Sequence, residues 1–360
     1  MSRPARPVLL VTNFAPPFRV GAFARLHERE DIVVALVGGG VRHGGGAGGP
    51  EPLPFPALRV PERAVGRLAA SGRFRAVIAG LSGRVALPSA YAGARAARIP
   101  FVLWATIWRH PRTPAHALSY VPLRHLYRHA DAIATYGPHV SAYVRSKGAR
   151  GPVVEAPQSV DDAFWADAAQ PHRIGGFQAM FAGRDAPEKG LGVLLRAWEA
   201  AGLGDGAAAL VLAGGGSFAA PRGVHAIGAL EPSAMRNFYA GSDVVVVPSV
   251  PTRDFLEPWG LVVNEAFDQG VPVIATTAVG AAAGGLVRHE QTGLVVAPGD
   301  VAGLAAALRR LHDDPALRTR LGAAARDAVR AFSHDAWAAG MARALAAAGV
   351  SRGGRGKSHC

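Results

Sequence analysis

The sequence is short of cysteine and has no long apolar run. Among its 360 residues the single cysteine, Cys360, is the last one, which excludes a disulfide within the chain. No uninterrupted apolar stretch is long enough to cross a bilayer. The start, MSRPARPVLLVTNFAPP, has the short apolar run of a first strand rather than a signal peptide. We therefore expect a cytoplasmic protein, with peripheral association at the inner face of the membrane left open.

Lysine is also scarce, although the chain is basic. Only three of the 39 basic residues are lysines (Lys147, Lys189 and Lys357), and the formal net charge is +13. The preference for arginine is what a GC-rich coding sequence would also produce. Such a charge favours anionic partners such as nucleotides, diphosphates or acidic membrane surfaces. The basic residues are scattered, without a compact run interleaved with aromatics, so we do not expect a nucleic-acid partner.

Short β-branched or apolar runs alternate with helical stretches rich in Ala, Arg and Leu along the whole chain. This alternation is typical of βαβ units and predicts parallel sheets. The strands expected in the first half cover residues 8–12, 32–37, 76–79, 101–105, 131–135 and 153–155. Those expected in the second half cover residues 178–182, 209–213, 224–227, 243–247, 271–275 and 294–296.

A looser, polar segment at residues 159–176 separates the two sets of strands. We therefore predict an α/β protein of two Rossmann-like doubly wound domains, residues 1–168 and 169–334, facing across a cleft. A helix with Ser333 as N-cap is expected to run through residues 335–350 and pack back toward the N-terminal domain, before a disordered basic tail at 351–360. Ligands of such folds bind beyond the carboxyl ends of the strands, and the cleft is the expected site.

The segment FAGRDAPEKG, residues 181–190, ends an expected strand and brackets a short loop with Arg184 and Lys189. Two cations five residues apart can converge on one anion, since Arg offers a planar fork and Lys a mobile point charge. This combination suits a diphosphate, and a lysine is an unusual choice in this chain. The alternative is a solvated loop with a surface pair between Glu188 and Lys189.

The segment LVLAGGGSF, residues 210–218, is an expected strand followed by three glycines and a serine. It is either a backbone nest for phosphate or a tight turn between strand and helix. Neither this turn nor the first one, TNFAPPFRVG, matches the GxGxxG dinucleotide fingerprint. A nicotinamide-dependent oxidoreductase therefore lacks its main support.

The segment EPWGLVVNEAFDQGVPVI, residues 257–274, places two glutamates in an apolar run. Pro258 suits the first position of a helix, so we expect Glu257 at a helix N-terminus. Glu265 would then lie about 80° around the helix and roughly 12 Å along it. The two carboxylates could grip two parts of one long ligand. Alternatively, Glu257 only complements the helix dipole and Glu265 is an exposed helix residue.

Five segments together resemble the retaining glycosyltransferases of the GT-B fold, specifically glycosyltransferase family four (glycosyl transferases group 1). They are FAGRDAPEKGL, LVLAGGG, IGALEPSAMRNFYAGSDVVVVPS, EPWGLVVNEAFDQGVPVIAT and GLVRHEQTGLVV. They come in the family's order and spacing between residues 181 and 298, and EPWGLVVNEA carries the family's E-x7-E element. The resemblance implies a nucleotide-diphosphate sugar as co-substrate, retention of anomeric configuration, and no metal or other cofactor.

The resemblance also implies catalytic roles after the turn at Gly183. Arg184 and Lys189 would hold the donor diphosphate and stabilise the leaving group. Glu257 would lie beside the donor sugar. This agrees with the residues themselves, because preorganised cations can neutralise the charge that builds on a departing nucleotide diphosphate.

The rest of the donor site is implied in the same way. Glu265 would bind the ribose hydroxyls, and the segment from Ile227 to Leu230 would line the base pocket. The backbone amides that would contact the phosphates belong to Trp259, Gly260 and Leu261.

The N-terminal half resembles the family's acceptor domain in outline. Where many members have paired glycines in the first loop, this chain has only Gly21, behind Arg19, and both are candidates for an acceptor-side loop. Members often place a histidine just after the strand that matches residues 101–105. Here His110 arrives slightly later, and it is either a catalytic residue or a surface or packing residue.

The sequence thus predicts a metal-independent, hexosyltransferase-type enzyme that moves a sugar to a hydroxyl acceptor. The acceptor is a glycan or lipid-linked intermediate, or a small natural product. Two alternatives are a sugar-nucleotide epimerase of the same fold and a non-catalytic nucleotide-sugar binding protein.

Overall fold

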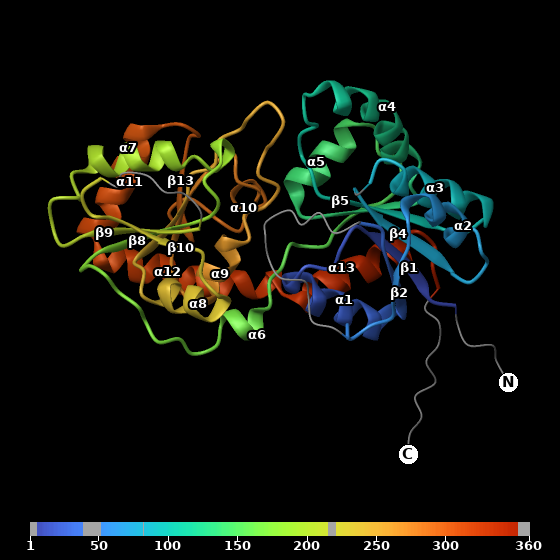
Figure 1. The fold of residues 1–360 in the computed structure, drawn as a ribbon, viewed down its shortest axis with the longest axis horizontal. Helices are drawn as coiled ribbons and strands as arrows, with labels where there is room; N and C mark the ends of the chain where they lie inside the picture. Colours follow the sequence, from blue (N-terminus) through green and yellow to red (C-terminus); the bar gives the residue numbers. More distant parts are fainter. Residues whose placement is uncertain (1–5, 39–51, 82, 215–220, 352–360) are drawn as a thin grey trace, which may run out of the picture. The chain divides into compact units, whose positions relative to one another are not determined.

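The computed structural model describes residues 6–38, 52–81, 83–214 and 221–351 (Figure 1). The chain divides into two compact units, here called the N-terminal unit (Met1–Ser159 with His334–Cys360) and the C-terminal unit (Val160–Ser333). The division falls nine residues before the expected boundary at 168/169. Most of the expected tail, residues 352–360, lies outside the described residues.

The N-terminal unit is built on a seven-stranded sheet in the order β3-β2-β1-β4-β5-β6-β7, and every neighbouring pair is parallel. The central strands are buried on both faces, as near-continuous apolar runs predict. The strands are β1 (Val8–Thr12), β2 (Ile32–Leu36), β3 (Ala57–Arg59), β4 (Ala76–Gly80), β5 (Phe101–Ala105), β6 (Ala132–Thr135) and β7 (Val153–Glu155).

Six α-helices of the described chain accompany this sheet: α1 (Pro17–Glu30), α2 (Val65–Ala69), α3 (Ala86–Ala96), α4 (Pro114–His129), α5 (Pro138–Ser146) and α13 (His334–Ala347). The last helix, α13, packs against the first, α1 (Figure 1). One face of α13 is apolar and buried, and it is formed by Trp337, Met341 and Leu345. A Cβ at Gly21 would lie only 2.4 Å from Nδ1 of His334, so this glycine lets the two helices approach.

The C-terminal unit has a six-stranded parallel sheet in the order β10-β9-β8-β11-β12-β13. Its strands are β8 (Gln178–Ala182), β9 (Ala209–Ala213), β10 (Val224–Gly228), β11 (Val244–Val247), β12 (Val273–Thr276) and β13 (Gly293–Val296). Its α-helices are α6 (Asp162–Trp165), α7 (Leu191–Ala201), α8 (Pro232–Ala240), α9 (Val262–Asp268), α10 (Gly280–Ala283), α11 (Val301–Asp313) and α12 (Pro315–Val329).

Two layers of helices cover this second sheet. Helices α7 and α11 pack side by side, and the side chains of Leu194, Trp198 and Leu308 join the strand residues in one buried cluster. Helices α8, α9 and α12 form a second packed group. Both faces of the central strands are therefore removed from water, which is the main source of stability for a parallel sheet.

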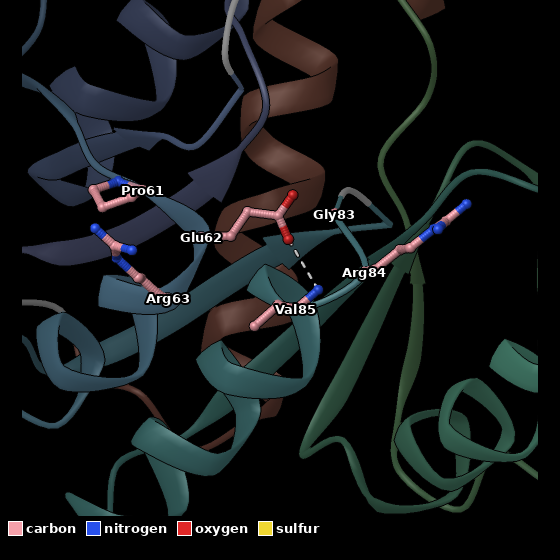
Figure 2. A pocket seen from close by; sticks show the side chains of 6 residues that line it. All are labelled: Pro61, Glu62, Arg63, Gly83, Arg84 and Val85. Carbon is pink, nitrogen blue, oxygen red and sulfur yellow. Dashed lines mark hydrogen bonds between the residues drawn. The ribbon is translucent and has the colours of Figure 1, made fainter.

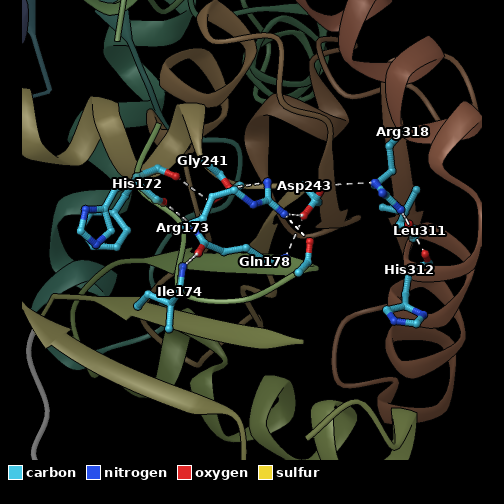
Figure 3. Close-up of polar contacts among 12 residues, drawn as sticks. His172, Arg173, Ile174, Gln178, Gly241, Asp243, Leu311, His312 and Arg318 are labelled. Atoms are coloured by element: carbon cyan, nitrogen blue, oxygen red, sulfur yellow. Dashed lines mark hydrogen bonds and ion pairs between the residues drawn. The ribbon is translucent and has the colours of Figure 1, made fainter. Parts of the chain in front are cut away.

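A cluster of polar side chains links the segment before β8 to the amino ends of the strands in the C-terminal unit (Figure 3). Asp243, just before β11, accepts hydrogen bonds from Arg173 Nη2 at 2.6 Å and from the backbone N–H of Gln178 at 2.8 Å. Arg318 Nε, from α12, lies 3.3 Å from the other carboxylate oxygen. This cluster sits at the amino edge of the sheet, so it supports the fold without approaching the carboxyl edge.

The predicted strands are confirmed, with ends that differ by at most two residues. The additional strand β3 was missed because its three residues are all exposed and show no apolar pattern. The expected helix start at Pro258 is wrong, since α9 begins only at Val262. Gly260 has a φ of +92°, a value outside the right-handed helical region, so no helix can run through it.

Candidate functional site

The carboxyl edge of the C-terminal sheet contains a topological switch point between β8 and β11. From β8 the chain proceeds outward to β9 and β10, and from β11 it proceeds in the opposite direction to β12 and β13. The loops that follow β8 and β11 therefore diverge, and a crevice at this place is where doubly wound folds bind ligands. The loops are residues 183–190 and 248–261, and they contain most of the predicted donor-site residues.

Lys189 and Glu257 meet at this switch point. The Nζ atom of Lys189 donates to Oε2 of Glu257 at 2.5 Å, although the residues are 68 positions apart in the sequence. Ser249 Oγ lies 3.4 Å from the same oxygen, and the ring centroid of Phe255 lies 5.9 Å from Nζ. The Glu257 side chain is 8% exposed and that of Lys189 is 23% exposed. The carboxylate is thus buried beneath an ammonium group that still reaches solvent.

The backbone of the two loops explains how this pair is held. Gly190 has a φ of +70°, and a Cβ there would lie 2.1 Å from the carbonyl oxygen of Pro248. The N–H of Val250 donates to the carbonyl of Glu188 at 2.9 Å. Because only glycine permits this contact, the sequence Lys-Gly at 189–190 both supplies the cation and packs one loop against the other.

Glu265 forms a second acidic position, on helix α9. Tyr239 of α8 donates its hydroxyl to Oε2 of Glu265 at 2.8 Å. Burial raises the pKa of Glu265 to about 7, and the hydrogen bond from Tyr239 opposes part of this rise. Burial also raises the pKa of Tyr239 well above its ordinary value. The phenol therefore stays protonated and orients the carboxyl group.

Arg184 does not join Lys189 in the structure. Its side chain is 64% exposed and pairs with Glu188 at 3.3 Å. Glu188 therefore pairs with Arg184, and the surface pair between Glu188 and Lys189 that we considered does not form. The two cations flank the same loop but face different carboxylates, so their convergence on one anion stays a prediction.

Three predicted donor-binding residues, Gly183, Ile227 and Leu230, lie at or just beyond the carboxyl ends of β8 and β10. Gly183 follows β8, and its N–H donates to the carbonyl of Ala213 at 2.9 Å. Ile227 and Leu230, at the end of β10 and just beyond it, are both half-buried. Residues 215–220 of the glycine-rich turn lie outside the described residues.

The three phosphate-contact candidates, Trp259, Gly260 and Leu261, lie in a loop rather than in the first turn of a helix. The indole of Trp259 is buried, donates to Asn264 Oδ1 at 2.7 Å and stacks near Phe332 at 5.4 Å between centroids. Its side chain is therefore a packing group, and only the backbone of this segment is available to a ligand.

Arg19 and Gly21 occupy helix α1 and not an acceptor-side loop, because Pro17 starts the helix earlier than expected. Arg19 is buried at 3% exposure. Its Nη2 donates to Tyr136 Oη at 2.7 Å and to Gln158 Oε1. Burial lowers its pKa. The guanidinium lies against the rings of Trp104 and Trp337, 4.9 and 5.7 Å from their centroids.

His110 is turned toward the start of α4. Its Nε2 lies 2.6 Å from the carbonyl oxygen of His116, and its ring contacts Tyr120 at 5.1 Å between centroids. Within the described residues these contacts give it a packing role, and the catalytic role stays a prediction.

Sequence reasoning missed Tyr239, Ser249 and Asp268. Asp268 is 6% exposed, and its Oδ2 has no hydrogen-bond partner among the described residues. Burial and the neighbouring carboxylate of Asp162 raise its pKa to about 8. Tyr239 and Ser249 both lie in the family-like segment IGALEPSAMRNFYAGSDVVVVPS. Nothing in their local sequence shows which glutamate each would contact.

An open pocket of about 790 Å³ lies in the N-terminal unit (Figure 2). It is formed after the carboxyl ends of β3 and β4, where Glu62 accepts hydrogen bonds from the N–H groups of Val85 and Ala86 at 2.9 and 3.1 Å. Arg63 and Arg84 lie on either side of this carboxylate in Figure 2. In this pocket the carboxylate of Glu62 binds the free N–H groups at the start of α3, and two arginine side chains lie nearby.

The described residues contain neither a metal-ligand cluster nor a membrane-spanning helix. No group of three or more His, Cys, Asp or Glu side chains in that part of the chain is arranged to hold a metal ion. None of the helices assigned there has the length and apolarity that a bilayer span requires.

Residues 176–314 match the family model described as "Glycosyl transferases group 1". A glycogen synthase of Mycobacterium tuberculosis is 33% identical over 178 residues, covering 46% of this chain and 41% of that protein. The lipopolysaccharide core biosynthesis glycosyltransferase LpsD of Rhizobium meliloti is 47% identical over 81 residues, covering 22% of this chain and 23% of that protein. The chain thus spans less than half the length of these curated relatives.

Among solved structures, Anabaena HepE in complex with UDP superposes with a TM-score of 0.73 at 18% identity, covering 94% of this chain and 99% of that one. The same protein has also been solved with UDP-glucose. This likeness shows that the whole chain has the GT-B fold, with its two doubly wound units. The predicted resemblance to group 1 glycosyltransferases is therefore confirmed, and the family-model match lies within the C-terminal unit.

Proposed function

We propose that this chain, whose C-terminal unit is a group 1 glycosyltransferase domain on a GT-B fold, transfers a sugar from a nucleotide-diphosphate sugar to a hydroxyl acceptor with retention of configuration. The observation that carries this proposal is the Lys189–Glu257 pair at the switch point between β8 and β11. It places a partly exposed cation and a buried carboxylate where a doubly wound sheet binds its ligand.

Lys189 is proposed to hold the donor diphosphate. An ammonium group has three donors, and Glu257 uses one of them, so the others can bind phosphate oxygens. Glu257 fixes the position of Nζ before the donor arrives, which lowers the cost of ordering the long side chain. As the bond to the sugar breaks, negative charge grows on the leaving diphosphate, and Lys189 together with the exposed Arg184 stabilises it. The proposed reaction therefore needs no metal ion.

Glu257 is proposed to lie beside the donor sugar and Glu265 beside the ribose. Tyr239 occupies Oε2 of Glu265, and we propose that the remaining oxygen meets the ribose hydroxyls. Ile227 and Leu230 would line the base, and the backbone of residues 259–261 would contact the phosphates. Because HepE has been solved with UDP and with UDP-glucose, a uridine nucleotide is the first donor to test.

The acceptor is proposed to be a glycan or lipid-linked intermediate that binds the N-terminal unit at the pocket of Glu62, Arg63 and Arg84. Two arginines beside a carboxylate that already caps a helix favour an acceptor with an anionic group. The name of the relative LpsD points in the same direction. The relatives named above are transferases and synthases, so the epimerase alternative and the non-catalytic alternative are not favoured.

A thermal-shift panel of nucleoside diphosphates and their sugars tests this proposal. A ligand that binds only the native state raises its stability, so we expect UDP and UDP-glucose to raise the melting temperature of the wild-type chain. Lys189→Met should lose this shift, whereas Lys147→Met, at the other described lysine, should keep it. If no nucleoside diphosphate or sugar nucleotide stabilises the wild-type protein, the proposed function is wrong.

A further inference from the structure

The amino-terminal part of helix α4 exposes apolar side chains. Leu118 is 83% exposed and Val121 is 71% exposed, and they exceed the other exposed large hydrophobic residues of the described chain. They are three positions apart, so they lie on one helix face. Ala117 and Pro122, beside them, are also exposed. These four residues are here called the apolar ridge.

The ridge projects because α4 is anchored at its other end. Its first buried side chains among the described ones are Leu126 and Tyr127. The helix nevertheless has a firm start, since Thr113 caps it by accepting from the N–H of His116 at 3.3 Å and Pro114 occupies the first turn. A well-formed helix is thus built with apolar residues pointing into solvent, which is unusual for a surface that has no partner.

The part of the sequence that contains the ridge is strongly basic. Between residues 63 and 154 the sequence has fourteen arginines and lysines and one acidic residue, Asp131. Arg95 pairs with that aspartate at 2.7 Å. Arg124, on α4, is exposed and has no ion-pair partner among the described residues. Lys147, at the end of α5, lies with Nζ 5.7 Å from the ring centroid of Tyr120, which brings a second cation to α4.

We propose that the apolar ridge docks the protein on an anionic lipid surface, with Leu118 and Val121 entering the acyl boundary and Arg124 and Lys147 contacting the headgroups. An apolar face flanked by basic side chains and free of acidic ones fits this binding mode. A second copy of the chain fits less well, because a two-fold contact would set this basic face against itself.

The docking surface rests on the proposed function in one respect. It implies that the enzyme meets its acceptor at a membrane. Helix α4 belongs to the same unit as the pocket of Glu62, Arg63 and Arg84. The docking surface contains none of the proposed donor-binding residues, which belong to the C-terminal unit. Membrane binding and donor binding can therefore be measured separately.

Co-sedimentation of the full chain with vesicles tests the surface. We expect the wild-type protein to sediment with phosphatidylglycerol–phosphatidylcholine vesicles. With pure phosphatidylcholine vesicles, most of the protein should stay in the supernatant. Leu118→Ser with Val121→Ser should weaken binding at least about tenfold, because two aliphatic side chains are lost from the apolar phase. Arg124→Gln with Lys147→Gln should weaken it by about fivefold per charge and reduce its sensitivity to salt. The matched control is Ile174→Ser, an exposed apolar residue of the other unit, which should bind like wild type.

Three results would overturn the proposal. The wild-type chain could stay in the supernatant with anionic vesicles, or the Leu118→Ser, Val121→Ser variant could sediment like wild type. Light scattering could instead show a dimer that this variant abolishes, without vesicle binding, which would assign the ridge to a second copy. A thermal shift with UDP-glucose, retained by the variant, confirms that it is folded. A wild-type chain that responds to UDP-glucose but ignores vesicles refutes only the docking surface, whereas binding to vesicles without any nucleotide response refutes only the proposed function.

Discussion

The sheets of the two units each have a topological switch point, but the cationic side chains of the two units differ in exposure and in their partners. In the C-terminal unit a lysine that reaches solvent rests on a buried carboxylate, Lys189 on Glu257. In the N-terminal unit the switch point lies between β1 and β4, and helix α1, which follows β1, carries Arg19 buried beneath aromatic rings. Arg19 has neutral partners, Tyr136 and Gln158, in place of a carboxylate.

This difference separates a cation that can serve a ligand from one that serves the fold. The side chain of Lys189 is preorganised by Glu257 and partly exposed, which suits the capture of a diphosphate. Nη2 of Arg19 donates its hydrogen bonds to Tyr136 and Gln158, which follow β6 and β7, and the guanidinium lies against Trp337 of α13. It therefore links the beginning, middle and end of the N-terminal unit. The following variants test this division of roles.

The largest effect is expected from Lys189→Met. This change removes the proposed cation at the leaving diphosphate, so kcat should fall by about 10²–10³, the loss typical of one preorganised donor in a charge-stabilising site. Steady-state transfer rates with a UDP-sugar and a water-soluble acceptor, measured without vesicles, check this, with Lys147→Met as the control. A variant with wild-type kcat would contradict the role given to Lys189.

The next largest effect is expected from Arg19→Ala, and it should be on stability. The substitution leaves the buried Tyr136 hydroxyl and Gln158 amide without their partner and opens a cavity among the rings, so we expect a loss of about 2–4 kcal/mol in the free energy of unfolding. Denaturant titration measures it. UDP should still raise the melting temperature of this variant. Loss of that shift with unchanged stability would mean that Arg19 serves ligand binding and not the fold.

Asp268 gives a pH dependence to the C-terminal unit. The pKa values of Asp268 and Glu265 are raised in the folded state to about 8 and about 7, from 3.8 and 4.5. Folding therefore favours the protonated carboxyls, so stability declines as the pH rises from their ordinary pKa values of 3.8 and 4.5 to their folded values of about 8 and about 7. Asp268→Asn should flatten this decline and gain about 1–3 kcal/mol at the alkaline end. Melting curves across the neutral range check it, and an unchanged slope would show that Asp268 is already ionised in the native protein.

The smallest effect is expected from Asp243→Asn at the amino edge of the C-terminal sheet (Figure 3). The neutral side chain weakens two arginine contacts that are partly exposed, so we expect a loss of about 1 kcal/mol in unfolding free energy. Binding of UDP, followed by calorimetry, should not change. A change in affinity would mean that the amino edge of the sheet influences the opposite edge.

Sequence patterns predicted the fold well because parallel strands are buried on both faces and read as β-branched runs between turns. They failed at β3, which is three exposed residues long, and at Pro258, where the proline suggested a helix that the positive φ of Gly260 prevents. Because the helix begins only after Gly260, Glu257 lies in a loop and not at the expected helix N-terminus.

Residue identities in the candidate site were predictable, but their partners were not. A lysine in an arginine-rich chain and two glutamates in an apolar run are visible in the sequence. That Lys189 meets Glu257, and Tyr239 meets Glu265, depends on how strands distant in the sequence are ordered in one sheet. For Arg19 and Gly21 the sequence suggested a ligand loop, whereas packing against α13 explains both residues.

Hydrogen–deuterium exchange of the full chain, with and without saturating UDP-glucose, tests the central claim most directly. The account predicts that the ligand slows exchange in residues 183–190 and 248–261, the two loops that hold Lys189 and Glu257. Lys189→Met should lose this protection and Lys147→Met should retain it. Exchange in both loops that is unaffected by UDP-glucose, while the ligand demonstrably binds, would contradict the account.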